Sequence, residues 1–199
     1  MTSDKSAVRR ILDQAKDAGR EALTAPEARG ICEAYGINIP KEGVARTGED
    51  AVRLASDIGF PVVMKIVSPQ ILHKTEAGGV LVGVKSADQV AQGFSTIVEN
   101  ARKYDPKAEI LGVQIQQMLT GGHEVIIGAV TDPAFGKLVA FGMGGILVEV
   151  LKDITFRLAP ATSEDALSML DGIQAAEILR GVRGAKPVDR EALDRRAHV

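Results

Sequence analysis

The short connections between neighbouring β-like segments are the feature that most restricts the fold of this chain. Apolar, β-branched segments alternate with segments of helical periodicity, yet the Gly121-Gly122 and Asp132-Pro133 turns join successive strands directly. Parallel strands need long crossover connections, so turns of this length favour an α+β fold. The turn at 120–122 is the predicted boundary between a lobe spanning residues 1–120 and a lobe spanning residues 121–199.

The periodicity of apolar residues predicts the order of the elements. Alternating or continuous β-branched patterns predict strands at 61–67, 80–85, 110–119, 123–130, 137–142 and 154–160. Apolar residues at helical spacing predict helices at 5–19, 25–35, 49–59, 87–104, 163–171 and 173–180. Thr24 and Glu27 have the spacing of a capping box at the start of the second helix. Residues 68–79 and the glycine-rich residues 142–145 are predicted to form loops.

The composition excludes several classes of partner. With 24 basic and 26 acidic residues the formal charge is −2, so no strong field attracts nucleic acid or an anionic membrane. No apolar stretch approaches the roughly 20 residues that span a bilayer, and the N-terminus lacks a signal-peptide core. Cys32 has no second cysteine to pair with and is predicted to be a buried structural thiol. We therefore expect a cytoplasmic protein that binds neither nucleic acid nor membrane.

Glycine is frequent and aromatic residues are rare, with 21 glycines, 2 tyrosines, 5 phenylalanines and no tryptophan. This profile favours close approach of the backbone to a polyanion over the stacking of bases. The sequence has no P-loop motif, and Leu147 stands where a dinucleotide fingerprint beginning at Gly142 needs its third glycine. One cysteine and three scattered histidines disfavour a zinc site.

Lys65 interrupts the apolar segment at 61–67. An ammonium group is almost never buried without a partner. Either Lys65 lies on an edge strand and its amine reaches water, or it points into a cleft and binds phosphate. The residue by itself leaves both interpretations open.

The stretch SPQILHKTEAGGV, residues 68–80, places several reactive side chains in one predicted loop. The imidazole of His73 is nucleophilic near neutral pH and can accept a phosphoryl group, whose charge Lys74 could neutralise. Gly78 and Gly79 would give the loop freedom to bend. The alternative is a solvated polar turn in which the histidine is incidental.

Seven glycines gather in the first part of the C-terminal lobe. Hairpin turns account for the first two, Gly121 and Gly122. They account less well for Gly142, Gly144 and Gly145, which precede an apolar segment. These three glycines could bring backbone N–H groups close to a phosphate chain. Glu124 and Glu149 lie within predicted apolar strands. Each is either an outward-facing residue or an inward ligand for ribose, ammonium or metal.

Three stretches of the chain together resemble one family. They are PVVMKIVSPQILHKTEAGGV, then GVQIQQML, then GHEVIIGAVTDPAFGKLVAFGMGGILVEVLKDITFRLAP. They are similar to the ATP-grasp portion of NDP-forming acyl-CoA synthetases, including ADP-forming acetate–CoA ligase, and of their succinyl-CoA synthetase relatives. The resemblance runs from about residue 20 to about residue 185, and HKTEAGGV and DPAFG…GMGG are its most specific parts.

The resemblance implies an ATP-grasp fold, in which two α+β lobes clamp a nucleotide. Lys65 would contact the nucleotide phosphates, the strand end at 116–118 would present backbone groups to adenine, and Glu124 and the glycines would lie near the nucleotide. The implied nucleotide-binding residues are Lys65, Gln116, Gln117, Met118, Glu124, Gly142, Gly144 and Gly145. His73 matches a catalytic histidine on a mobile loop, which receives a phosphoryl group from a phosphohistidine in another domain and carries it to ADP.

The implied activity converts acyl-CoA, ADP and phosphate into carboxylic acid, CoA and ATP, with ATP/ADP and Mg²⁺ as cofactors. In the family an acidic-Asn-Pro segment and a following Asp hold the metal. Nothing like it follows Pro187, so we expect no metal-binding residue in this chain and an incomplete C-terminal lobe. The CoA-binding and first phosphohistidine domains would lie on another chain or segment, and an oligomer is compatible with this arrangement. The alternative function is a non-catalytic regulatory or interaction module, such as the synthetase-like part of a protein lysine acetyltransferase. An ATP-grasp carboxylate–amine ligase is disfavoured by the HKTEAGGV loop, since those enzymes use no phosphohistidine.

Overall fold

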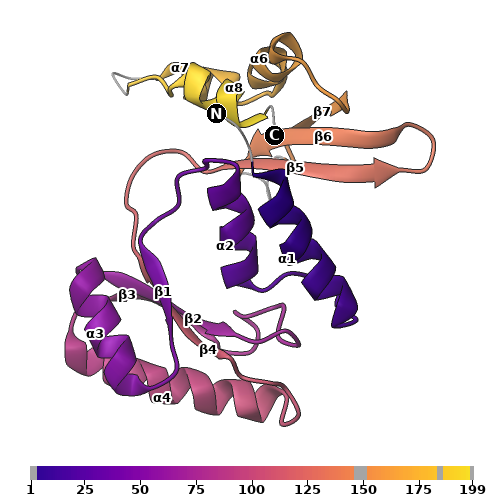
Figure 1. The fold of residues 1–199 in the computed structure, drawn as a ribbon. Coiled ribbons are helices and arrows are strands. Elements are labelled where there is room, and N and C mark those ends of the chain that lie inside the picture. The colour runs from indigo at the N-terminus through magenta and orange to yellow at the C-terminus, as the bar shows by residue number, and fades with distance from the viewer. Residues whose placement is uncertain (1–3, 146–151, 183–185, 198–199) are drawn as a thin grey trace. The chain divides into compact units, whose positions relative to one another are not determined.

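The computed structural model describes residues 4–145, 152–182 and 186–197 (Figure 1). The chain divides into two compact units, residues 1–120 (unit 1) and residues 121–199 (unit 2). Within the described residues, no helix is both long enough and apolar enough to cross a membrane.

Unit 1 is built on a four-stranded antiparallel sheet. Its helices are α1 (Lys5–Asp17), α2 (Ala25–Ala34), α3 (Gly48–Ile58) and α4 (Ala87–Tyr104). Its strands are β1 (Glu42–Ala45), β2 (Val62–Val67), β3 (Val80–Val84) and β4 (Gly112–Gln117). The strand order is β1-β4-β2-β3, so β4 lies between β1 and β2 although β1 is about seventy residues earlier in the chain.

One face of this sheet forms the core of unit 1 against α3 and α4 (Figure 1). Met64 and Ile66 of β2 are fully buried and belong to one hydrophobic cluster with Val90 and Ile97 of α4. Successive side chains of a strand point to opposite faces of the sheet. The residues between these apolar ones, Lys65 among them, therefore lie on the face turned away from the two helices.

An ion pair between Arg20 and Glu27 holds the start of α2. Two guanidinium nitrogens of Arg20 donate to the Glu27 carboxylate at 2.8 and 2.6 Å, and the backbone N–H of Thr24 donates to it at 2.7 Å. The predicted capping box is confirmed. The hydrogen bond from Arg20, followed by that from Thr24, outweighs partial burial and lowers the pKa of Glu27 from 4.5 to about 2.

We expect Arg20→Ala to lower the free energy of unfolding near pH 7, because the variant loses the charged donor that holds the Glu27 carboxylate. Because the folded-state pKa of Glu27 lies below its unfolded value of 4.5, this stabilisation is present above that value and is lost as the pH falls toward 2. Urea denaturation should therefore show the difference between wild type and variant shrinking as the pH falls from about 4.5 toward about 2. Arg9→Ala, at an exposed position on α1, is the control. A difference that does not change with pH would contradict the assignment.

Unit 2 is a three-stranded antiparallel sheet with helices on one face. Its strands are β5 (Val125–Asp132), β6 (Gly136–Met143) and β7 (Ile154–Leu158), in the order β5-β6-β7. Its helices are α6 (Ser163–Gly172), α7 (Ala176–Arg180) and α8 (Arg190–Ala197). The core joins Phe141 and Met143 of β6 to Met169, Leu170 and Leu179 of the helices.

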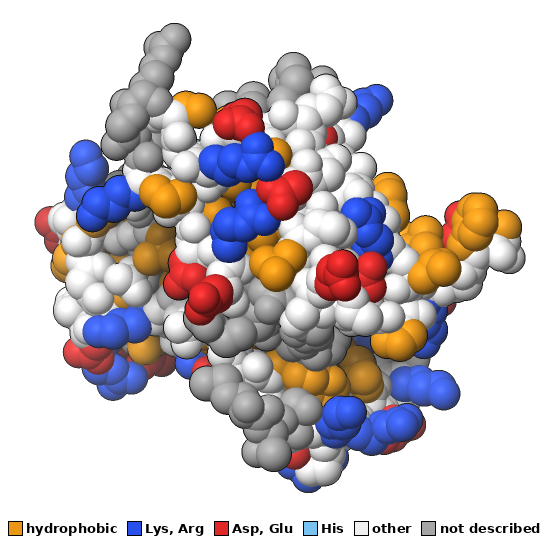
Figure 2. Space-filling model, turned by 90° about the horizontal axis from the view of Figure 1, so that it is seen from above, with side chains coloured by type: hydrophobic (Ala, Val, Ile, Leu, Met, Phe, Trp, Pro, Cys, Tyr) orange, Lys and Arg blue, Asp and Glu red, His pale blue; other side chains and the backbone are white. Residues whose placement is uncertain are grey.

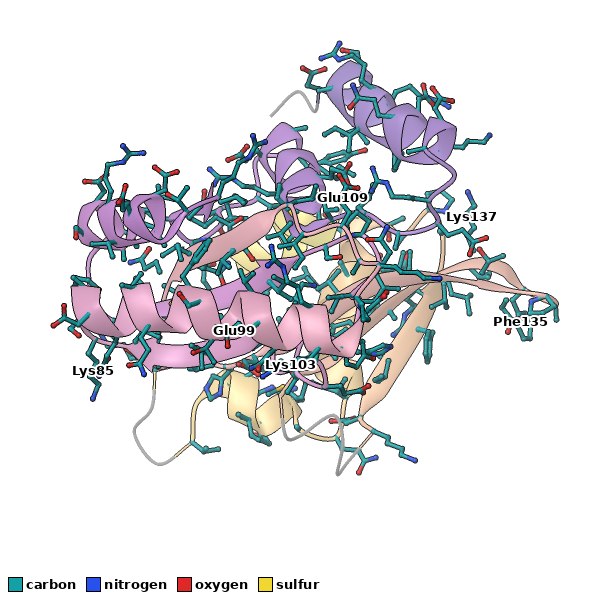
Figure 3. All side chains as sticks on the ribbon, turned by 90° about the horizontal axis from the view of Figure 1, so that it is seen from below. Lys85, Glu99, Lys103, Glu109, Phe135 and Lys137 are labelled. Atoms are coloured by element: carbon teal, nitrogen blue, oxygen red, sulfur yellow. The ribbon has the colours of Figure 1, made fainter. Side chains whose placement is uncertain are left out.

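The opposite face of this sheet exposes apolar side chains. Pairing in register places Val130 of β5 beside Leu138 of β6 and Leu138 beside Leu158 of β7. Val130 and Leu158 are exposed, and Phe135 at the tip of the β5–β6 hairpin is 71% exposed (Figure 3). Hydrophobic side chains are also visible at the right-hand end of this hairpin in Figure 2.

Three local predictions are wrong. Gly142 does not lie in a loop, because β6 continues through it to Met143. Glu124 precedes β5 and is exposed, so it is not part of an apolar strand. Cys32 is only partly buried on α2, which has no fully buried residue among its ten. Glu149, the other predicted strand glutamate, lies outside the described residues.

Candidate functional site

Lys65 extends from the polar face of the sheet in unit 1. Its Nζ donates a 2.8 Å hydrogen bond to Oε1 of Gln116, and both side chains are half-buried. An ammonium group has three donors, so this contact leaves protons for a further acceptor. Lys65 also lines a pocket, which favours the second of the two interpretations of this residue, a lysine pointing into a cleft.

Gln116 connects Lys65 to a residue that the sequence analysis missed. Its Nε2 donates to Oε2 of Glu42 at 2.5 Å, and Glu42 is its direct partner across β1 and β4. Glu42 lies in a strand of only four residues, so the sequence around it carries no clear signal of a site. Gln114 pairs directly with Lys65 in the β2–β4 ladder and is 4% exposed. Its side-chain amide makes no hydrogen bond within the described part of the chain.

Gln117 and Met118 follow Gln116 at the end of β4. The backbone N–H of Gln117 donates to Lys41 at 2.8 Å, and that of Met118 donates to Pro61 at 3.3 Å. Both amide donors are thus used within unit 1. The Met118 carbonyl accepts no hydrogen bond from the described residues, so it remains available to a ligand.

The His73 loop covers one end of the same polar face. Lys65 and the loop residues Leu72, His73, Lys74, Thr75 and Glu76 line a pocket of about 580 Å³, together with Val80. The His73 side chain is 77% exposed, and its Nδ1 lies 3.9 Å from Oε1 of Glu76. The structure therefore brings Lys65 and His73 into one pocket of unit 1, with the imidazole accessible from solvent.

The glycines of this loop allow close packing. Gly78 has a left-handed φ of 59°, and a Cβ on it would lie 2.9 Å from the amide nitrogen of Asn100. A Cβ on Gly79 would lie 2.5 Å from Cγ2 of Ile66. The buried side chains of Ile71 and Ala77 anchor the loop on either side of His73. Close packing gives a structural reason for both glycines, and the freedom of the loop to bend stays a prediction.

The candidate residues of unit 2 form a second group. The backbone N–H of Gly144 donates to the Glu124 carbonyl at 2.7 Å, and Oε2 of Glu124 lies where a side chain on Gly145 would be. Gly142 is apart from them inside β6, and a Cβ on it would be 2.5 Å from the Asp153 carbonyl oxygen. Glu124, Gly144 and Gly145 thus lie together, whereas Gly142 is required by the packing of β7 against β6.

The described residues contain no group of three or more His, Cys, Asp or Glu side chains that could hold a metal ion.

Comparison with known proteins identifies the family. The chain matches the ATP-grasp domain family over residues 14–196. Subunit beta of ADP-forming acetate–CoA ligase I from Pyrococcus furiosus is 52% identical over 185 residues, which cover 93% of this chain and 79% of that protein. ADP-forming 4-hydroxybutyrate–CoA ligase from Nitrosopumilus maritimus is 48% identical over 94% of this chain and 27% of its own length.

A solved structure agrees with these matches. Dinucleotide-forming acetyl-coenzyme A synthetase 1 of Ca. Korarchaeum cryptofilum, in complex with coenzyme A, Ca-AMPCP and HgCl+, superposes with a TM-score of 0.89 at 42% identity. The match covers 96% of this chain and 83% of that one.

The chain therefore belongs to the ATP-grasp family, which confirms the expected fold class. Within that family it falls among the ATP-grasp modules of NDP-forming acyl-CoA synthetases, which are ligases.

Proposed function

We propose that this chain binds ADP and ATP and carries a phosphoryl group on His73 within an ADP-forming acyl-CoA synthetase. The observation that supports this is the pocket that Lys65 shares with the His73 loop. A phosphate-binding cation and an exposed nucleophile in one pocket are the two groups that a phosphoryl transfer through histidine requires. Membership of the ATP-grasp family supports a nucleotide as the ligand.

The proposed chemistry in the direction of ATP formation has two transfers. His73 first attacks the phosphorus of a phosphohistidine on another domain, forming its own P–N bond as the donor P–N bond breaks. A β-phosphate oxygen of ADP then attacks that phosphorus, and the P–N bond to His73 breaks to give ATP and free imidazole. Lys65 would stabilise the negative charge on the transferring group and on the nucleotide phosphates.

The remaining parts of the reaction belong to other regions of the enzyme. We propose that the CoA-binding domain and the first phosphohistidine lie on another chain or on a segment beyond these residues. We propose Glu124, Gly144 and Gly145 of unit 2 as further nucleotide-binding residues, and the Met118 carbonyl of unit 1 as a contact for adenine. Mg²⁺ would accompany the nucleotide. Acetate is the acid named for the Pyrococcus furiosus relative, and a small carboxylic acid is the proposed substrate class.

Calorimetric titration of the 199-residue chain with ADP and ATP, with and without Mg²⁺, tests the nucleotide-binding part of this proposal. We expect ADP to bind with a Kd of about 1–100 μM, because enzymes commonly bind substrates near their cellular concentrations. Adenosine should bind more weakly, because it offers Lys65 no phosphate. The absence of heat with either nucleotide in every condition would overturn the proposal.

A further inference from the structure

A row of hydrogen-bonded polar side chains crosses three adjacent strands of unit 1. Glu42 lies on β1, Gln116 on β4 and Lys65 on β2. The carboxylate accepts from the Gln116 amide nitrogen at 2.5 Å, and the Gln116 amide oxygen accepts from the Lys65 ammonium at 2.8 Å. All three side chains are half-buried, and the row ends in the pocket of the His73 loop.

The chemistry of the amide gives this row a direction. A side-chain amide is a donor on one end and an acceptor on the other, and it can be turned over by rotation. The Glu42 carboxylate can only accept, so it fixes the NH₂ end of Gln116 toward β1. The oxygen end is then held toward β2, where it faces the ammonium of Lys65. Without the carboxylate, a turned-over amide would place its NH₂ group against the ammonium.

The position of Glu42 is itself well held. It pairs with Gln116 in the β1–β4 ladder, and its backbone carbonyl accepts a 2.6 Å hydrogen bond from the Arg29 guanidinium of α2. The backbone of Glu42 is therefore held by the strand pairing on one side and by a helix side chain on the other, so its side chain starts from a fixed position beside Gln116.

We propose that Glu42 is a positioning residue for nucleotide binding, acting through Gln116 to hold the ammonium of Lys65 toward the phosphates. This inference rests on the proposed function. Glu42 is not expected to touch the nucleotide. Its effect should appear only in ligands that carry phosphate, and only when Lys65 is present.

A double-mutant cycle tests this role in the 199-residue chain, with Glu42→Gln, Lys65→Met and the combined variant titrated with ADP and with adenosine. We expect Glu42→Gln to weaken ADP binding by about 3–10-fold and to leave adenosine binding and the thermal midpoint unchanged. In the Lys65→Met background, Glu42→Gln should have no further effect on ADP. Glu99→Gln is the matched control, since Glu99 is exposed on α4, which covers the other face of the sheet (Figure 3).

Every other outcome contradicts the inference about Glu42, the proposed function, or both. If Lys65→Met weakens ADP binding and Glu42→Gln does not, the inference fails while the proposed function stands. An equal loss from Glu42→Gln with and without Lys65 also overturns it, because Glu42 would then act by another route. If wild type binds no ADP, both fail. Should Glu42→Gln not fold, Gln116→Met breaks the same row and must show the same dependence on Lys65.

Discussion

Replacing His73 with alanine is expected to abolish ATP formation in the enzyme reconstituted with its CoA-binding and phosphohistidine domains. The fall should be at least about 10⁴-fold, because the variant has no atom at this position that can form the P–N bond. The side chain is 77% exposed, and its Nδ1 lies 3.9 Å from Oε1 of Glu76, so its removal should cost little stability. ADP binding by the 199-residue chain should stay within about twofold of wild type.

Labelling with phosphate distinguishes loss of the phosphoryl carrier His73 from loss of the nucleotide-binding site. ATP labelled at its γ-phosphate should transfer an acid-labile label to the wild-type protein and none to His73→Ala. His123 remains in the variant and is also exposed, so it serves as an internal control for nonspecific labelling. A variant that still makes ATP from acyl-CoA, ADP and phosphate would remove the carrier role, and would favour a non-catalytic module whose loop histidine is incidental.

The fold could largely be predicted from the sequence because its elements have local signatures. The β-branched run at β2, the helical spacing at α4 and the Thr24–Glu27 cap are each determined by residues close together in the chain. Local pattern could not show that β4 lies between β1 and β2. That pairing joins Glu42 to Gln116, 74 positions apart, and Gln116 to Lys65, 51 positions apart. The polar row therefore exists only in the folded sheet.

The glycines show the limit of compositional reasoning about the site. A backbone that must approach an anion and a backbone that must pack closely against its own protein both need glycine. Gly79 packs against Ile66, and Gly142 against the backbone of Asp153, so a structural cause accounts for each. Gly145 differs, because a Cβ built on it would meet a carboxylate oxygen, Oε2 of Glu124. The left-handed Gly145 therefore lies beside a polar side chain and not against the apolar core. The nucleotide-binding role of Glu124, Gly144 and Gly145 stays a prediction.

Replacing Lys65 with methionine should have the second large effect. Methionine keeps the length and apolar stem of lysine but removes the charge, so the sheet of unit 1 should keep its stability. A charge-assisted hydrogen bond to phosphate contributes about 1.5–3 kcal/mol, which corresponds to a loss of about 10–150-fold in ADP affinity. The rate of transfer between His73 and ADP should fall by about 10²–10³-fold, because the charge that develops on the phosphoryl group loses its counter-charge.

The pattern across ligands is the sharper measurement for Lys65. Calorimetry should show a large loss for ATP and ADP, a smaller loss for AMP and no change for adenosine, since the ammonium acts on phosphate alone. Lys103→Met, at an exposed position on α4, is the matched control and should bind every ligand as wild type does (Figure 3). Equal weakening of adenosine and ADP would mean that Lys65 supports the sheet or the adenine contact instead. The ammonium of Lys65 would then have a structural role at the end of the Glu42–Gln116–Lys65 row. The pocket that it shares with His73 would need a different source of positive charge, and Lys74, which also lines the pocket, is the nearest candidate in sequence.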